Sequence, residues 1–231
     1  MNMNQNMTAN FWMTSIINFS TYGEEEYSVD GVTFRVGTNA NICVGITGVA
    51  CQEVNFFTNN VPTRTLPAIS FAVKDLVRVR EICGDDKEKF HAALRFFVGH
   101  EIGHQVEFHR AQLNGTFRQG MTPNESFADA YAIKASNGMI DEALYKNISH
   151  IMERMAGYYM EQVQIKGPLG KFLKKLDKWG NRAIFNLRKK QTLQHLSNET
   201  TLVTDETAFD QISKIVEFVE GVMPEAENKV S

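Results

Sequence analysis

Two histidines and a glutamate within five consecutive residues are the part of this sequence best suited to chemistry. They belong to the segment His100-Glu101-Ile102-Gly103-His104. Positions i and i+4 of a helix lie on one face about one turn apart, so the two imidazoles can bind the same cation. Glu101 lies about 100° further round the helix axis than His100. Its carboxylate can therefore act on a molecule at that cation without being a ligand.

The spacing matches the H-E-x-x-H pattern of zinc sites, where zinc lowers the pKa of a bound water toward about 7. Glu101 would accept the proton of that water as it attacks a carbonyl group. The surrounding positions, from Val98 to Val106, are otherwise uncharged and suit a buried helix. Gly99 and Gly103 each cost a helix about 1 kcal/mol relative to alanine. Close approach of a sheet, a substrate or a second helix would explain that cost, and the alternative is a core helix with a polar patch.

Glu125 is the best candidate for a third ligand, because zinc hydrolases typically have three protein ligands and one open position. Twenty residues separate it from His104, enough to end one helix and bring a second helix back over the metal. Asp129 lies one turn beyond Glu125 and could hold a ligand histidine by its free N–H. Two alternatives stay open. Thr122 and Glu125 also fit a capping box, and Asp129 could be a plain solvated carboxylate.

Together, the segments 100–104 and 124–129 resemble the gluzincin group of metallopeptidases, which share a thermolysin-like catalytic core. The resemblance covers about 30 of the 231 residues, so it concerns an active site rather than the whole chain. It implies hydrolysis of peptide bonds in a peptide or protein substrate, with Zn²⁺ as the cofactor. It implies that the zinc ligands are His100, His104 and Glu125. It also implies that Glu101 is the general base and that the carboxylate of Asp129 orients a ligand histidine.

The same resemblance implies an edge strand that runs beside the active-site helix and binds the substrate backbone. Residues 68–73 are the candidate, by position. Larger members of the group steady the oxyanion with a downstream histidine or tyrosine, and this sequence has no recognisable counterpart. Four residues could supply one, and the sequence does not choose among them: Tyr131, His150, Tyr158 and Tyr159.

Two other functions remain open at this level. A zinc-stabilised, non-catalytic binding or regulatory protein would use residues 166–196 as its contact surface. Glu101 argues against it, because a purely structural zinc site needs no base and is normally closed by four ligands. Amide cleavage in a non-protein substrate would use the same residues as proteolysis.

Residues 166–190 carry nine basic side chains and a single acid, Asp177. On an amphipathic helix such a segment could contact nucleic acid, an anionic membrane surface or an acidic partner. The simpler interpretation is a solvated outer face whose apolar stripe packs on the core. The basic residues are Lys166, Lys171, Lys174, Lys175, Lys178, Arg182, Arg188, Lys189 and Lys190.

Hydrophobic periodicity and turn residues predict an α+β fold, with a small, largely antiparallel sheet packed on a mainly helical core. The resemblance to gluzincins implies that this core is zincin-like. A hairpin is predicted at Asp30-Gly31, and short strands over 32–36, 41–46 and 68–73. Helices are predicted over 8–19, 85–114, 122–137, 141–164, 171–196 and 206–221. We expect a catalytic domain over 1–165 and a C-terminal helical segment over 166–231, packed on the same core.

Composition predicts a soluble, cytoplasmic protein. The net charge of −3 gives no global reason to expect nucleic-acid binding. Three cysteines are too few for a disulfide framework, which favours a reducing compartment. The first ten residues contain no lysine or arginine, which argues against a secretory signal. No eighteen apolar residues run together, so no transmembrane segment is expected.

Overall fold

The computed structural model describes residues 22–39, 49–58, 61–118, 124–162, 168–197 and 207–230. Its strands are β1 (Tyr22–Val29), β2 (Val32–Asn39), β3 (Val49–Thr58) and β4 (Val61–Ala72). Its helices are α2 (Val73–Cys83), α3 (Lys87–Leu113), α4 (Glu125–Ala135), α5 (Glu142–Gln162), α6 (Pro168–Ser197) and α7 (Ala208–Val230). The predicted helix 8–19 and strand 41–46 lie outside the described residues. At this coarse level the fold is α+β, as expected.

The four strands form one mixed sheet in the order β1-β2-β4-β3. Two of its pairings are antiparallel, β1 with β2 and β3 with β4, whereas β2 and β4 run parallel. The hairpin between β1 and β2 is at the predicted place. Asp30 and Gly31 have φ values of 47° and 79°, the positive values that a two-residue type I′ turn requires at both central positions.

The proposed substrate-binding edge strand is wrong, because residues 68–72 lie in the interior of the sheet. This part of β4 pairs with residues 35–39 of β2 on one side and with residues 49–52 of β3 on the other. Its backbone groups are therefore occupied by neighbouring strands and cannot add a substrate strand. Val73 is not in the strand at all, because α2 begins there without a turn residue or a side-chain cap.

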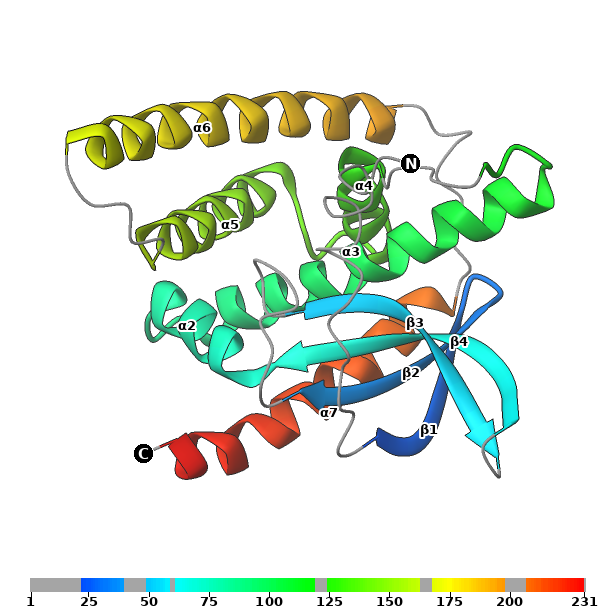
Figure 1. Ribbon diagram of the computed structural model, residues 1–231. Helices are drawn as coiled ribbons and strands as arrows, with labels where there is room; N and C mark the ends of the chain where they lie inside the picture. Colours follow the sequence, from blue (N-terminus) through cyan, green and yellow to red (C-terminus); the bar gives the residue numbers. More distant parts are fainter. Residues whose placement is uncertain are drawn as a thin grey trace, which may run out of the picture.

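Helix α3 occupies the centre of the described structure (Figure 1). The sheet lies on one side of it, α4 and α5 lie on the other, and α6 runs across α4 and α5. Asp86 caps the helix by accepting a hydrogen bond from the backbone N–H of Lys89 at 2.9 Å. Buried residues lie all round α3, including Phe90, Leu94 and Ile102, as expected of a helix that is covered on several sides.

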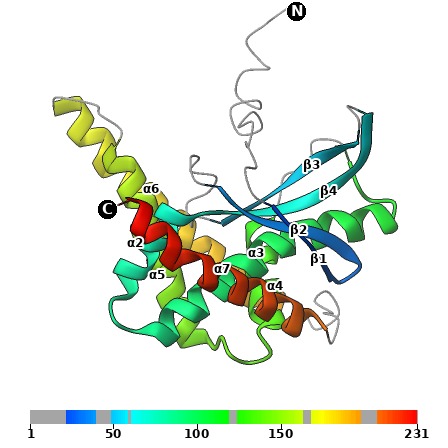
Figure 2. The same cartoon turned by 90° about the horizontal axis from the view of Figure 1, so that it is seen from below.

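Helix α7 packs against α3 and β1, and Figure 2 shows it alongside α3. It extends to Val230, beyond the predicted end at residue 221. Its buried Ile215 and Val219 belong to the same hydrophobic core as Phe34 and Ile69 of the sheet. A C-terminal helix therefore completes the core that holds α3. Among the described residues, no helix combines the length and the apolar character needed to cross a membrane.

Candidate metal centre

His100 and His104 of α3 and Glu125 of α4 converge on one point. Their possible ligand atoms all lie within 4.8 Å of one another. The two Nε2 atoms are 3.1 Å apart. Oε2 of Glu125 is 3.4 Å from Nε2 of His100, and Oε1 is 3.5 Å from Nε2 of His104. The three side chains therefore point at a common centre from two helices.

These separations fit a metal ion at the centre. Two ligands of a tetrahedral zinc, each 2.0–2.1 Å from the metal, are about 3.3–3.4 Å apart. The two Nε2 atoms are 3.1 Å apart, and the distances from them to the two different oxygens of Glu125 are 3.4 and 3.5 Å, all close to that value. Two imidazoles and a carboxylate are also a common donor set for catalytic zinc. The side chain of Glu125 is 52% exposed, so one side of the group faces solvent.

Close packing of α3 on α4 brings the ligands together, and the two glycines of α3 allow it. A Cβ added at Gly103 would lie 3.0 Å from Cα of Ala128, and one at Gly99 would lie 3.1 Å from Cα of Ala132. The sequence allowed a sheet, a substrate or a second helix as the close neighbour of these glycines, and in the structure the neighbour is a second helix, α4. The backbone of α4 occupies the space that longer side chains would need.

The start of α4 differs from the prediction, and the difference concerns Glu125. The N-cap is Asn124, whose side chain accepts from the backbone N–H of Phe127 at 3.1 Å. Glu125 is thus the first helical residue, not the third, so its position does not fit a capping box that has Thr122 as the N-cap. Thr122 lies outside the described residues. Glu107 fixes the entry to α4, because its Oε2 accepts from the backbone N–H of Asn124 at 3.0 Å.

Asp129 is buried beneath the ligands. Its Oδ1 lies 2.9 Å from Nδ1 of His100, within hydrogen-bond distance. Its carboxylate is completely inaccessible to solvent, so Asp129 is not a solvated surface group. A carboxylate on Nδ1 directs the other ring nitrogen, Nε2, toward the metal position and keeps it free to bind.

Arg188 of α6 joins the same group, which the sequence did not predict. Its Nε and Nη2 donate to Oδ2 and Oδ1 of Asp129 at 2.7 and 2.6 Å. Its Nη1 lies 2.8 Å from Oε2 of Glu125. The side chain is only 16% exposed, so the interpretation of 166–190 as a solvated basic face is wrong at Arg188. Ile184 and Leu187 of the expected core-facing stripe are instead 62% and 57% exposed.

Two further polar side chains complete the layer below the ligands, and neither stood out in the sequence. The hydroxyl of Tyr145 donates to Oδ2 of Asp129 at 2.8 Å and lies 3.1 Å from Oγ1 of Thr192. Both residues are buried, Tyr145 on α5 and Thr192 on α6. Asp129 therefore receives hydrogen bonds from α3, α5 and α6 together.

The chain matched no family model, no curated protein and no solved structure. The similarity to gluzincins therefore rests on the two short segments that carry the cluster.

Electrostatics in the metal-free protein follow from this network. Burial opposes the charge on His100, but hydrogen bonds to Asp129 and Glu125 outweigh it and raise its pKa to about 9. Burial likewise opposes the charge on Asp129, but Arg188 and His100 lower its pKa to about 2. The pKa of Glu125 falls well below its usual range, because the two imidazoles outweigh the effect of burial.

The structure describes the side chains of two of the four candidate oxyanion residues, Tyr131 and His150, and each has its partner away from the ligands. The hydroxyl of Tyr131 donates to Oδ2 of Asp30 at 2.7 Å, at the turn between β1 and β2. His150 is exposed on α5 and lies 3.9 Å from Glu153. Tyr158 and Tyr159 are also on α5, and their side chains lie outside the described part of the structure. Glu101 is half-buried on α3, next to His100.

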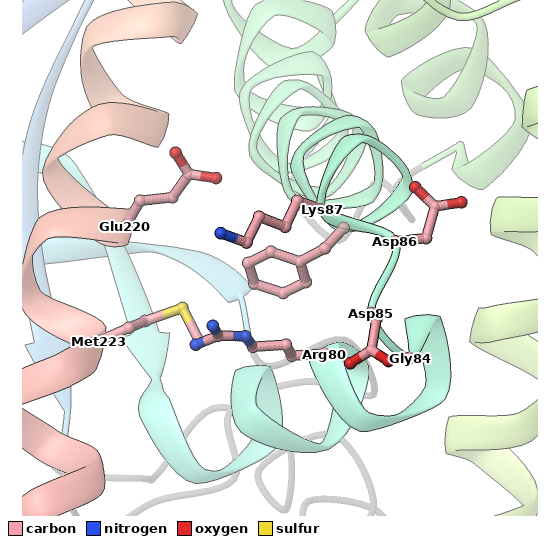
Figure 3. Close-up of a pocket in the computed structure, with 8 residues that line it drawn as sticks. Arg80, Gly84, Asp85, Asp86, Lys87, Glu220 and Met223 are labelled. Atoms are coloured by element: carbon pink, nitrogen blue, oxygen red, sulfur yellow. The ribbon is translucent and has the colours of Figure 1, made fainter.

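Two cavities lie near α3 and α4. One of about 400 Å³ is at the N-terminal end of α3 (Figure 3), about 15–20 Å along the helix from His100 at 1.5 Å per residue. Its lining includes both basic and acidic side chains. The lining residues are Arg80, Gly84, Asp85, Asp86, Lys87, Phe90, Glu220 and Met223. The other, of about 380 Å³, lies between α4 and α6, and its lining includes both neighbours of Glu125 in sequence. It is lined by Asn124, Ser126, Gln191, Gln194 and His195.

Proposed function

We propose that this protein is a zinc-dependent hydrolase that cleaves peptide bonds. The observation that carries the proposal is the convergence of His100, His104 and Glu125, whose possible ligand atoms lie within 4.8 Å of one another on a side that Glu125 exposes to solvent. A structural zinc site is normally closed by four protein ligands, whereas a catalytic site keeps one position open. Glu101, adjacent to the first ligand, supplies the base that such a site needs.

Each residue has a defined task in this proposal. Bound zinc would polarise a water molecule and lower its pKa toward about 7. Glu101 accepts the proton of that water and then delivers it to the leaving amine. Asp129 accepts from Nδ1–H of His100, which fixes the ring with its Nε2 free. Peptide hydrolysis needs no further group to balance, because the added water provides both the new hydroxyl and the proton.

The depression between α4 and α6 supports access of a substrate from the side of Glu125. Its lining is polar and offers amides, a hydroxyl and an imidazole, which can hydrogen-bond a peptide backbone. Residues 68–72 cannot perform that task, because they lie in the interior of the sheet. Substrate contacts are therefore expected from α4 and α6 rather than from β4.

The test measures zinc content and peptide hydrolysis in the same preparations. Glu125→Ala should lose zinc, because two imidazoles alone hold the metal weakly. Glu101→Gln should keep zinc and lose hydrolysis of a fluorescence-quenched peptide library, since the amide cannot accept a proton. Glu88→Gln, an exposed change near the start of the same helix, is the matched control and should alter neither quantity.

Three results would count against the proposal. Equal zinc in wild type and Glu125→Ala would remove Glu125 from the site. Hydrolysis that survives Glu101→Gln would remove Glu101 as the base. Stoichiometric zinc without hydrolysis in the wild type would favour a zinc-stabilised binding protein instead.

A further inference from the structure

Arg188 reaches the metal centre from a distant part of the chain. It lies on α6, 59 residues beyond Asp129 in sequence. Its guanidinium donates to both oxygens of Asp129, its Nη1 forms an ion pair with Oε2 of Glu125 at 2.8 Å, and its Nη2 lies 3.5 Å from Nδ1 of His100. The guanidinium is planar and presents its donors in a fixed fork. One side chain therefore fixes two carboxylates of α4 relative to each other.

The two oxygens of Glu125 have different surroundings as a result. Oε2 lies 2.8 Å from Nη1 of Arg188, which is a close ion pair. Each oxygen also lies near one ligand histidine, Oε2 at 3.4 Å from Nε2 of His100 and Oε1 at 3.5 Å from Nε2 of His104, so the ion pair with Arg188 is what distinguishes them. A carboxylate can bind a cation through one oxygen or through both. Here Oε2 already has a cationic partner, which Asp129 holds in place.

We propose that Arg188 is a positioning residue of the metal centre, which limits Glu125 to a single ligand oxygen. The proposal rests on the function proposed above. With its second oxygen held by Nη1, Glu125 occupies one coordination position, and a position remains for water. The same guanidinium anchors Asp129, which holds His100, so a residue of α6 sets the orientation of two ligands.

A purely structural role predicts something different. If Arg188 only attached α6 to α4, its replacement would weaken folding and metal binding together. The arrangement of ligands around a bound metal would then be unchanged. The two roles are therefore separated by the coordination number of the metal, not by the loss of activity.

The experiment adds Co²⁺ alone to the metal-free protein and records its visible absorption. Four-coordinate Co²⁺ absorbs more strongly than five-coordinate Co²⁺, so the intensity reports the number of ligands. The variants are Arg188→Lys, Arg188→Met and, as the control, Lys190→Met, which removes an exposed charge from the same helix. Lysine keeps the positive charge but lacks the fork, so it cannot hold both carboxylates.

Wild type and Lys190→Met should give the same intense spectrum. Arg188→Lys should bind Co²⁺ with a weaker absorption, and its affinity for Zn²⁺ should fall by about 10- to 100-fold. Arg188→Met should show the same loss of intensity if it folds, and Arg188→Lys decides the matter if it does not. An unchanged spectrum in Arg188→Lys would overturn the role of Arg188 while leaving the proposed function intact. Absence of Co²⁺ binding in the wild type would instead remove the metal centre itself.

Discussion

Replacing Gly103 by alanine tests whether close helix packing assembles the ligands. The added Cβ would lie 3.0 Å from Cα of Ala128, 3.1 Å from Cβ of Tyr131 and 3.2 Å from the carbonyl oxygen of Ala128. None of these atoms can be moved by rotating a side chain. Ordinary contact begins at 3.4 Å, so α4 must retreat from α3 by about 0.4 Å, and the retreating helix carries Glu125.

Two opposing terms set the expected change in stability. Alanine favours the helix over glycine by about 1 kcal/mol. Overpacking of a well-packed contact costs about 1–3 kcal/mol. The free energy of unfolding of Gly103→Ala should therefore be lower than that of wild type by up to about 2 kcal/mol. Zinc affinity should also fall by at least about tenfold, because a metal site tolerates ligand displacements of only about 0.2 Å.

Gly221 of α7 provides the matched control. It is also helical, but an added Cβ there meets nothing within 4 Å. Gly221→Ala should therefore gain up to about 1 kcal/mol from helix propensity and leave zinc affinity unchanged. Urea unfolding of the metal-free variants gives the first quantity, and competition with a chromophoric chelator gives the second. The two alanine variants should differ in stability by about 1–3 kcal/mol.

The result that refutes this reasoning is specific. If Gly103→Ala is as stable as Gly221→Ala and binds zinc as tightly as wild type, the contact between α3 and α4 is not tight. Loss of stability with unchanged zinc affinity would show that the position of Glu125 does not depend on that contact.

Two further changes probe the charges below the ligands. Asp129→Asn should lower the free energy of unfolding by up to about 3–5 kcal/mol, because it removes the buried counter-charge of Arg188 and leaves only the half-exposed Glu125. The exposed Asp85→Asn should have little effect in the same urea experiment. Zinc binding at pH 7 should release at least one proton, since His100, with a pKa of about 9, must lose its proton to bind, and a zinc-bound water with a pKa of about 7 would add part of a second. Calorimetry in buffers of different ionisation enthalpy measures that proton, and its absence would contradict the raised pKa. Without metal, the stabilisation from this raised pKa is present at low pH and lost as pH rises through about 9.

The spacing of residues along the sequence predicted much of the candidate site. His100 and His104 lie one helical turn apart, so their convergence needs only that residues 100–104 be helical. Glu125 and Asp129 share a face of α4 for the same reason. The glycines at 99 and 103 indicated a close neighbour, and the structure identifies it as α4. All of these contacts lie within one helix or between two helices that follow each other in the chain, so the spacing of residues can predict them.

Other features depend on relations that spacing does not contain. Helix α2 follows β4 directly, with no turn residue and no capping side chain to mark the change. Residues 68–72 resemble any short apolar strand, and only the parallel pairing of β4 with β2 places them inside the sheet. Sheet order is set by long-range packing, so an interior strand and an edge strand can have the same local sequence.

The orientation of α6 shows how one buried charge can override an apolar pattern. Turning Ile184 and Leu187 toward the core would gain at most about 1.5–3 kcal/mol for each side chain fully buried, and each is already partly covered. The same rotation would withdraw Arg188 from Asp129, whose carboxylate is completely buried, and breaking such a pair costs about 3–5 kcal/mol. It would also remove Thr192 from Tyr145. The observed orientation of α6, which exposes two aliphatic residues, is therefore the more stable one. The carboxylate that decides it lies on a different helix, so the sequence of α6 alone does not reveal it.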